Sequence, residues 1–226
     1  EDYAVLALMG PEAARIVSEC GAPELNELGY FKVGPANIAG KHVRAARLSY
    51  VGEAGWEITM KAKNAAAIYA ALASVGAKPA GLYAQTSMRI EKGFCAMGHE
   101  LDSDVTPIDV GLDFATRKAG GFIGDEALAE RRKKRGSLFL VSLKFHDETA
   151  IPLGHEPIYY DDKIIGKISS CAFGYRIGKP VALGAVRHHA ASGIVVQVDI
   201  ARQFFDATLV THPLYDPEGI RMKSYE

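Results

Sequence analysis

The chain has 226 residues, 48% of them hydrophobic, and its 26 Lys and Arg residues nearly balance 27 Asp and Glu residues for a formal net charge of −1. This length and hydrophobic content suffice for one large core or two smaller ones without disulfides or structural metals. A balanced charge gives no overall attraction to nucleic acid or to an anionic membrane, so any recognition of an anion must be local.

The three cysteines, Cys20, Cys95 and Cys171, lie far apart and form no CxxC pair. Their number and spacing argue against a disulfide framework and a thiolate metal site, and favour a reducing compartment, either the cytoplasm or a matrix.

No apolar run approaches the roughly 18 residues of a spanning helix. The chain begins with Glu1 instead of Met, which leads us to expect a fragment or a processed chain.

The first third of the chain predicts a layer of strands and helices. Residues 4–9 are expected to form a buried strand, and Pro11 and Glu12 to open a helix that Gly21 ends. Strands follow between residues 30 and 60, around the turn VGEAG. In the last of them Trp56, Ile58 and Met60 share one face, with Glu57 and Thr59 on the other.

Two further helices are predicted next. Asn64 is expected to cap a helix that Gly76 ends, and Leu82, Thr86 and Ile90 have the four-residue spacing of another. This order of elements indicates an α+β fold.

The second half is predicted to be rich in short strands. Residues 121–136 change from acidic to basic along the chain, the order that a helix dipole favours, and are expected to form a linker helix. Without interleaved aromatic residues, the basic run 131–135 is interpreted as a solvated helix end and not as a nucleic-acid patch. Strands separated by turns indicate a small antiparallel barrel or sandwich; they are expected at 138–145, 157–160, 164–173, 181–186, 194–200 and 203–210.

Several common sites are excluded by spacing. His99-Glu100 and His155-Glu156 lack the second histidine of a zinc-protease helix, so no metal site is predicted. Residues 174–180 are one residue short of a phosphate-binding loop and carry Pro180 where a hydroxyl is needed. Cys95 has no partners that mark a nucleophile, and a packed thiol is expected there.

The most informative stretch is LSYVGEAGWEI at residues 48–58. Its glycines allow a close approach to a ligand, and the short connection is predicted to bring Tyr50 and Glu57 side by side on neighbouring strands. A carboxylate accepts two parallel N–H bonds, which suits an amino group beside a ring N–H, while tyrosine offers a ring face or a hydroxyl. The pair suits a pterin. Taken alone, Glu57 on a polar strand face is more often solvated, and Tyr50 is more often a filler at a strand end.

Three segments resemble the glycine-cleavage T-protein superfamily, and they follow one another in the family's order. They are YVGEAGWEI at 50–58, SMRIEKGFCAMGHELDSDVTPIDVGL at 87–112 and GHEPIYYDDKIIGKISSCAFGYRIGKPVALGAV at 154–186. The first and third look most like the folate module of dimethylglycine and sarcosine dehydrogenases. The resemblance implies part of a folate-binding aminomethyltransferase domain at 1–120, a linker helix at 121–136 and a C-terminal antiparallel β-barrel at 137–226.

The resemblance also implies roles for three residues. Tyr50 matches a tyrosine that lines the folate pocket, Glu57 the acid that holds the pterin ring, and Arg89 an arginine associated with the folate site. A structural ion pair is the alternative for Arg89. Asp109 stands where the family usually has Glu, so altered hydrogen bonding is expected there.

The implied activity is one-carbon transfer to tetrahydrofolate from an amine-derived donor, with FAD held only by an upstream oxidoreductase domain. An aspartate that the family contributes from its N-terminal part has no counterpart here, so no catalytic residue is assigned. The isolated chain is expected to lack part of the folate cavity and to be inactive or to bind folate weakly. Two alternatives remain. One is a stand-alone T-protein or a folate-dependent demethylase; the other is a non-enzymatic folate-binding factor for iron-sulfur proteins, whose KGCYxGQE signature residues 92–100 match only in part.

Overall fold

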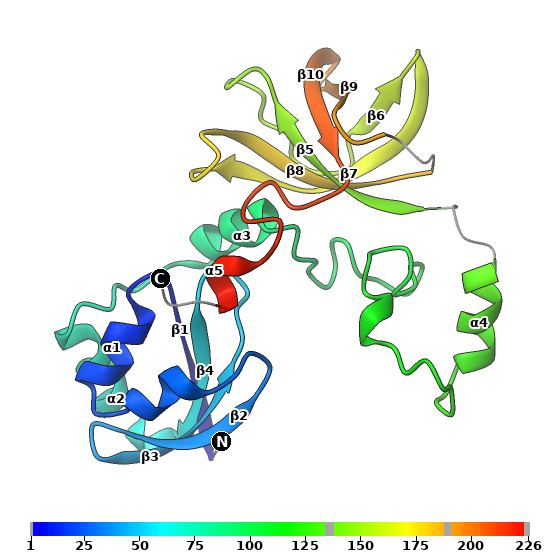
Figure 1. The fold of residues 1–226 in the computed structure, drawn as a ribbon. Coiled ribbons are helices and arrows are strands. Elements are labelled where there is room, and N and C mark those ends of the chain that lie inside the picture. The colour runs from blue at the N-terminus through cyan, green and yellow to red at the C-terminus, as the bar shows by residue number, and fades with distance from the viewer. Residues whose placement is uncertain (1, 134–137, 188–190, 224–226) are drawn as a thin grey trace. The chain divides into compact units, whose positions relative to one another are not determined.

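The computed structural model describes residues 2–133, 138–187 and 191–223. The chain divides into two compact units, drawn in Figure 1, of which the first comprises residues 1–85 and 218–226 and the second residues 86–217. We call them the sheet unit and the barrel unit. Helix α3 (Leu82–Glu91) crosses the boundary between them.

The sheet unit is a four-stranded antiparallel sheet in the order β1-β4-β3-β2. Side chains alternate along each strand, so one face is apolar and packs against helices α1 and α2, with Trp56 and Ile68 fully buried between them. Its elements are β1 (Tyr3–Met9), α1 (Ala13–Glu19), η1 (Pro23–Glu27), β2 (Val33–Ile38), β3 (Lys41–Arg47), β4 (Gly55–Lys61), η2 (Ala62–Asn64), α2 (Ala65–Ser74) and α5 (Ile220–Lys223).

The last helix of the chain belongs to this first unit. The Arg47 side chain is 2% exposed, and its Nη2 donates to the carbonyl oxygen of Met222 in α5 at 3.1 Å. The same guanidinium lies 4.9 Å from the centroid of the Trp56 ring. A buried cation thus fastens the end of the chain to the sheet.

The barrel unit contains a closed six-stranded antiparallel barrel in the order β10-β5-β8-β7-β6-β9. Its interior is apolar, with Leu143, Phe145 and Ile168 fully buried. Ahead of the barrel lies a long irregular segment. The elements are η3 (Asp113–Ala115), α4 (Asp125–Lys133), β5 (Phe139–Phe145), β6 (Pro157–Tyr160), β7 (Lys163–Gly174), β8 (Lys179–Val186), β9 (Ile194–Ile200) and β10 (Gln203–Val210).

The predicted fold class is confirmed in both units, and the choice between barrel and sandwich is decided for a closed barrel. Three local predictions were wrong. Residues 4–9 lie in strand β1 as expected, but the strand is not buried, since Val5 is 57% exposed. The first helix begins at Ala13, after Pro11 and Glu12, and Asn64 precedes α2 but its side chain makes no capping hydrogen bond. Of the predicted helix at 121–136, α4 is observed, and residues 134–136 lie outside the described part. The predicted domain boundaries stay predictions.

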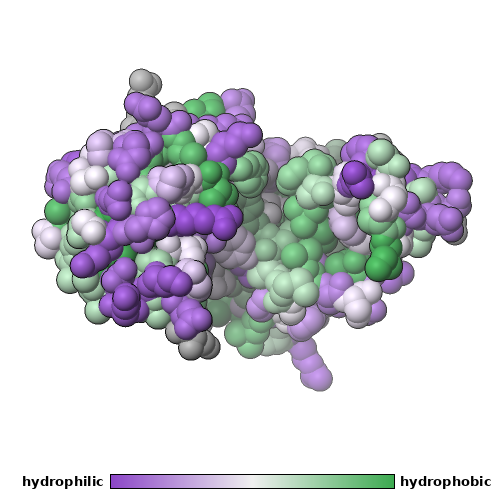
Figure 2. All heavy atoms as spheres, turned by 90° about the horizontal axis from the view of Figure 1, so that it is seen from below, coloured by the Kyte–Doolittle hydropathy of each residue, from purple (hydrophilic) through white to green (hydrophobic). Residues whose placement is uncertain are grey.

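Hydrophilic and hydrophobic residues are mixed on the surface. On the face drawn in Figure 2, hydrophilic residues (purple) lie among hydrophobic ones (green). Within the described residues, no helix is both long enough and apolar enough to cross a bilayer. Exposed large hydrophobic residues include Tyr83, Met97, Phe114 and Ile123.

Candidate functional site

Glu57 lies on the face of the sheet opposite to the helices. The strand register places Ala7 of β1 on one side of it and Ala46 of β3 on the other, and Val33 of β2 pairs with Ala46. Because directly paired residues of antiparallel strands point to the same face, these four side chains form one row across the sheet. The Glu57 carboxylate is therefore flanked by two methyl groups.

The Glu57 side chain is half-buried, and no hydrogen bond or ion pair to it is found in the described part of the chain. A polar group that loses water without gaining a partner is costly, and a carboxylate accepts N–H donors readily. Small neighbours and an unused acceptor together make this row able to receive a flat donor group.

Tyr50 lies outside the strands, in the connection between β3 and β4. It is half-buried, and its backbone N–H donates to Met9 Sδ at 3.4 Å. The residue of β3 that pairs with Glu57 is Ala46. The prediction that Tyr50 and Glu57 stand side by side on neighbouring strands was therefore wrong, because β3 ends at Arg47 and the connection is longer than expected.

Gly55 explains how this connection enters the sheet. A Cβ at this position would come within 2.5 Å of the Leu8 carbonyl oxygen, so only glycine lets β4 begin this close to β1. Gly52, with φ of +81°, makes the turn just before it.

Arg89 lies in the barrel unit and is 2% exposed. Its Nη1 donates to Glu100 Oε2 at 2.7 Å and to the Phe94 carbonyl oxygen at 3.1 Å, and its Nη2 donates to Ser170 Oγ at 2.7 Å. The ion pair with Glu100 is almost completely buried, at 3% and 1% side-chain exposure. This geometry matches the structural alternative for Arg89, while its role in a folate site stays a prediction.

Glu100 is the centre of this network. Besides Arg89 it accepts hydrogen bonds from Ser169 Oγ at 2.7 Å and from the Ala96 backbone N–H at 3.0 Å. Burial opposes ionisation of the carboxyl, but hydrogen bonds from the Ser170 and Ser169 hydroxyls, the charge of Arg89 and the Ala96 amide outweigh it and lower its pKa. Glu100 is therefore held as a carboxylate.

Ser169 and Ser170 are adjacent in the chain, yet both contact the Arg89–Glu100 network because β7 is irregular there. The register with β8 shifts between Ile168 and Ser170, which leaves Ser169 as the extra residue of a bulge. In a regular strand adjacent side chains would point to opposite faces. The sequence analysis did not identify Glu100, Ser169 and Ser170 as members of a network. The serines lie about 70 to 80 positions from Glu100 and Arg89 in the chain, and no local sequence pattern predicts contacts at such a separation.

Asp109, where the resemblance led us to expect altered hydrogen bonding, is 5% exposed. Its Oδ2 accepts from the backbone N–H and the hydroxyl of Thr106, at 2.9 and 2.6 Å, and Arg131 of α4 pairs with Oδ1 at 2.5 Å. Burial opposes its ionisation, but the Thr106 bonds and Arg131 together lower its pKa. Asp109 thus joins α4 to the preceding segment.

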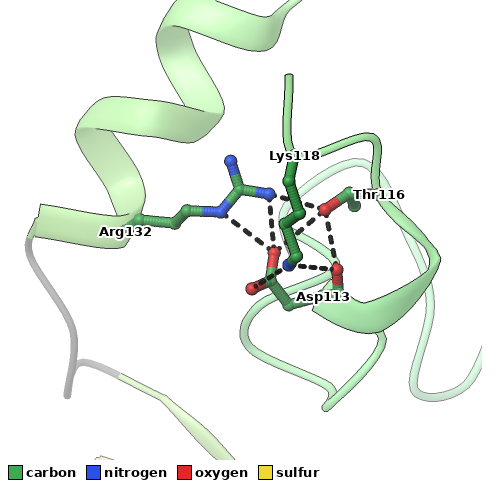
Figure 3. Close-up of polar contacts among 4 residues, drawn as sticks. All are labelled: Asp113, Thr116, Lys118 and Arg132. Carbon is green, nitrogen blue, oxygen red and sulfur yellow. Dashed lines mark hydrogen bonds and ion pairs between the residues drawn. The ribbon is translucent and has the colours of Figure 1, made fainter. Parts of the chain in front are cut away.

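A second junction to α4 is drawn in Figure 3. Arg132 Nη2 donates to Asp113 Oδ1 at 2.8 Å and to Thr116 Oγ1 at 2.6 Å, and Lys118 Nζ bonds Asp113 Oδ2 at 2.8 Å. Hydrogen bonds from Arg132 and Lys118 hold the pKa of Asp113 far below its ordinary value. Arg131 and Arg132 are therefore ion-paired, which corrects the reading of the basic run as simply solvated. Residues 134 and 135 of that run lie outside the described part.

Cys95 is half-buried, and burial, followed by the nearby Glu100 carboxylate, raises the pKa of its thiol to about 11. At neutral pH such a thiol is protonated and a poor nucleophile. The packed role predicted for Cys95 agrees with this environment.

Comparison with known proteins gives the family. Residues 1–120 match the GCVT N-terminal domain, and residues 139–216 match the Glycine cleavage T-protein C-terminal barrel domain. The chain is 29% identical over 232 residues to the mitochondrial dimethylglycine dehydrogenase of Mus musculus, covering 99% of this chain and 27% of that protein. It is 31% identical over 226 residues to an aminomethyltransferase of Rubrobacter xylanophilus, covering 97% of this chain and 60% of that protein.

The fold agrees with these matches. The crystal structure of glycine cleavage system aminomethyltransferase T from Bartonella henselae superposes with a TM-score of 0.83 at 29% identity, covering 95% of this chain and 60% of that one. The chain thus spans 27% to 60% of the length of these relatives. Because the first family match covers more than half of the chain and the second covers the barrel, the resemblance found in the motifs is confirmed, and the chain belongs to the glycine cleavage T-protein family.

Proposed function

We propose that this chain is the folate-binding part of an enzyme that transfers a one-carbon unit to tetrahydrofolate, and that Glu57 holds the pterin ring. The observation that carries the proposal is the Glu57 carboxylate itself. It is half-buried and has no partner in the described residues. By the motif resemblance alone, it falls on the acid that holds the pterin ring in the family.

The surroundings of Glu57 support a flat ligand. An amino group and the adjacent ring N–H of a pterin donate two parallel bonds, which a carboxylate accepts with both oxygens. Ala7 and Ala46 leave room beside the carboxylate, and Val33 extends the row with apolar surface. These residues bind and orient the ring, and the tetrahydrofolate supplies the nitrogen atoms that take up the carbon.

Tyr50 and Arg89 are proposed folate residues on their match to the family motif alone. The donor is proposed to be an N-methyl amine, as the name of the dimethylglycine dehydrogenase relative suggests, with an FAD-containing domain upstream that oxidises it. A cytoplasmic location is part of the same proposal. A stand-alone T-protein is the competing assignment, in line with the name of the Rubrobacter xylanophilus relative, aminomethyltransferase.

Titration calorimetry with tetrahydrofolate on the product of the complete gene tests the proposal. Glu57→Gln keeps the shape of the side chain but removes the charge, and is expected to weaken binding by about 2 kcal/mol, roughly 30-fold. Glu24→Gln, an exposed glutamate of the same unit, is the matched control and should bind as the parent does. Equal affinity of the Glu57→Gln variant and the parent would remove Glu57 from the site.

A further inference from the structure

The barrel unit contains a cavity of about 680 Å³. Its volume falls within the range of roughly 300 to 1,000 Å³ that small-molecule sites occupy. One wall consists of residues from β5, β6, β7 and β8 and their flanks, and another of the segment 98–110 that precedes α4. Tyr50, Glu57 and Arg89 are not among the residues that line it.

The barrel wall is cationic at one place. Lys167 of β7 and Leu140 of β5 both pair with Ala185 of β8, and the Arg187 backbone N–H donates to the Ile165 carbonyl oxygen. Lys167 and Arg187 therefore come from adjacent strands at one end of the barrel wall. Neither side chain has a hydrogen bond or ion pair among the described residues, and both are exposed where they line the cavity.

The wall formed by the segment 98–110 is anionic. Asp102 and Asp104 both line the cavity, and the one bond found for their carboxylates in the described chain is that of Asp102 Oδ1 with the Asp104 backbone N–H, at 2.8 Å. Glu100 also lines the cavity, but Arg89 balances its charge. Two cations, Lys167 and Arg187, and two anions, Asp102 and Asp104, thus line the same cavity. No ion pair joins the cations to the anions among the described residues.

Apolar side chains occupy a large part of the remaining lining, among them Val110, Leu140 and Ile164. The segment that carries the aspartates is held in place by buried bonds. Glu100 is fixed by Arg89, and Asp109 by Thr106 and Arg131. A cavity with fixed walls avoids part of the ordering cost of binding.

We propose that this cavity binds a small zwitterion that carries a carboxylate and an ammonium group on an apolar body, as a hydrophobic amino acid does. The carboxylate meets Lys167 and Arg187, the ammonium group meets Asp102 and Asp104, and the body contacts Leu140 and Val110. A simple anion would bring its charge towards two aspartates, and a simple cation towards a lysine and an arginine. His99 and His155 also line the cavity.

Three isosteric probes test the charge requirement on the intact protein by NMR and calorimetry. L-leucine carries both groups, 4-methylpentanoate only the carboxylate, and 3-methylbutylamine only the ammonium group. Leucine is expected to bind with a dissociation constant near 1 mM or below, and each half-ligand at least tenfold more weakly. The proposal is overturned by equal binding of either half-ligand, or by no binding of leucine at about 10 mM.

Matched variants locate the binding. Lys167→Gln and Asp102→Asn should each weaken leucine binding about tenfold or more. Lys163→Gln, on the same strand but outside the cavity, and Asp162→Asn, on an exposed turn, should leave it unchanged. Equal losses in the variants and their controls would place the binding elsewhere. Tetrahydrofolate titration of the same variants reports separately on the proposed pterin contacts.

Discussion

The charged side chains of Arg89 and Glu100 lie almost without solvent contact inside the barrel unit. Such a pair gains little net stability over apolar residues, but removing one partner leaves a buried charge uncompensated. The pair therefore acts as a positioning device. It fixes residues 96–101 to β7, and with them one wall of the cavity.

Arg89→Met is expected to lower the free energy of unfolding of the barrel unit by about 3 kcal/mol, because Glu100 then stays buried without its cation. The double variant Arg89→Met/Glu100→Gln should lose clearly less than the sum of the single losses. Urea unfolding of the four proteins measures the coupling. Additive losses would show that the two side chains do not act as a pair.

Glu100 also predicts a dependence on pH. Its pKa in the folded chain lies below the ordinary value of 4.5, so its contribution is complete above that pH and is lost as the pH falls through the lower folded value. The stability difference between the parent and Glu100→Gln should therefore shrink below about pH 4.5. Unfolding midpoints measured from about pH 3 to pH 6 check this; a constant difference would contradict it.

The thiols of Cys95 and Cys171 both have a pKa raised to about 11, chiefly by burial. At pH 8 the thiolate fraction is then roughly 100-fold lower than at an ordinary pKa of 9.0. The folded protein should react correspondingly slowly with a chromogenic disulfide reagent and faster as the pH rises. Urea-unfolded protein is the control, and equally fast labelling of both states would refute the expectation.

Helix α4 depends on side-chain bonds for its attachment, since Leu128 is its one buried residue. Its acidic first turn and basic last turn suit the helix dipole, but such effects are small. Arg131 and Arg132 connect it to Asp109 and Asp113 of the preceding segment. The structure of α4 and the structure of that segment therefore stabilise each other.

Arg132→Gln is expected to speed amide hydrogen exchange in α4 and in residues 113–118 several-fold, because Asp113 and Thr116 lose their shared donor. Lys133→Gln is the control, since the one ion pair found for Lys133 among the described residues is with Glu130, on the exposed surface of the same helix. Mass spectrometry of exchanged peptides distinguishes the two. Similar exchange in both variants would mean that α4 does not depend on this junction.

At the scale of the whole molecule, the chain forms two compact units, and its single tryptophan, Trp56, lies in the core of the sheet unit. Tryptophan fluorescence therefore reports on that unit. Gly166 lies in the barrel, where a Cβ would come within 2.1 Å of the Ala185 carbonyl oxygen. Trp56 fluorescence thus reports on the sheet unit, while a substitution at Gly166 perturbs the barrel unit.

Gly166→Ala is expected to destabilise the barrel unit by about 2 kcal/mol or more, because β7 and β8 must separate to admit the methyl group. The midpoint followed by far-UV circular dichroism should fall, and the midpoint followed by Trp56 fluorescence should fall less. Gly81→Ala, with open space around it, should change neither. Coincident shifts would show that the two units unfold as one.

The sequence alone determined the elements and much of the family. Alternation of apolar and polar residues located β4, because a strand with one buried face shows a period of two in its sequence. Short apolar runs bounded by turn residues located β1 and the barrel strands. The YVGEAGWEI segment and the later motifs gave the family, which the comparisons confirm. The residues expected in the folate site stay predictions.

Tertiary structure alone decided which residues meet. The strand register put Ala46 beside Glu57, and a bulge in β7 turned Ser169 and Ser170 towards one buried network. Arg89 found its partner Glu100 there and not on a helix surface. Such contacts depend on register, bulges and the close approach of segments far apart in the chain, and no local period of hydrophobicity records them.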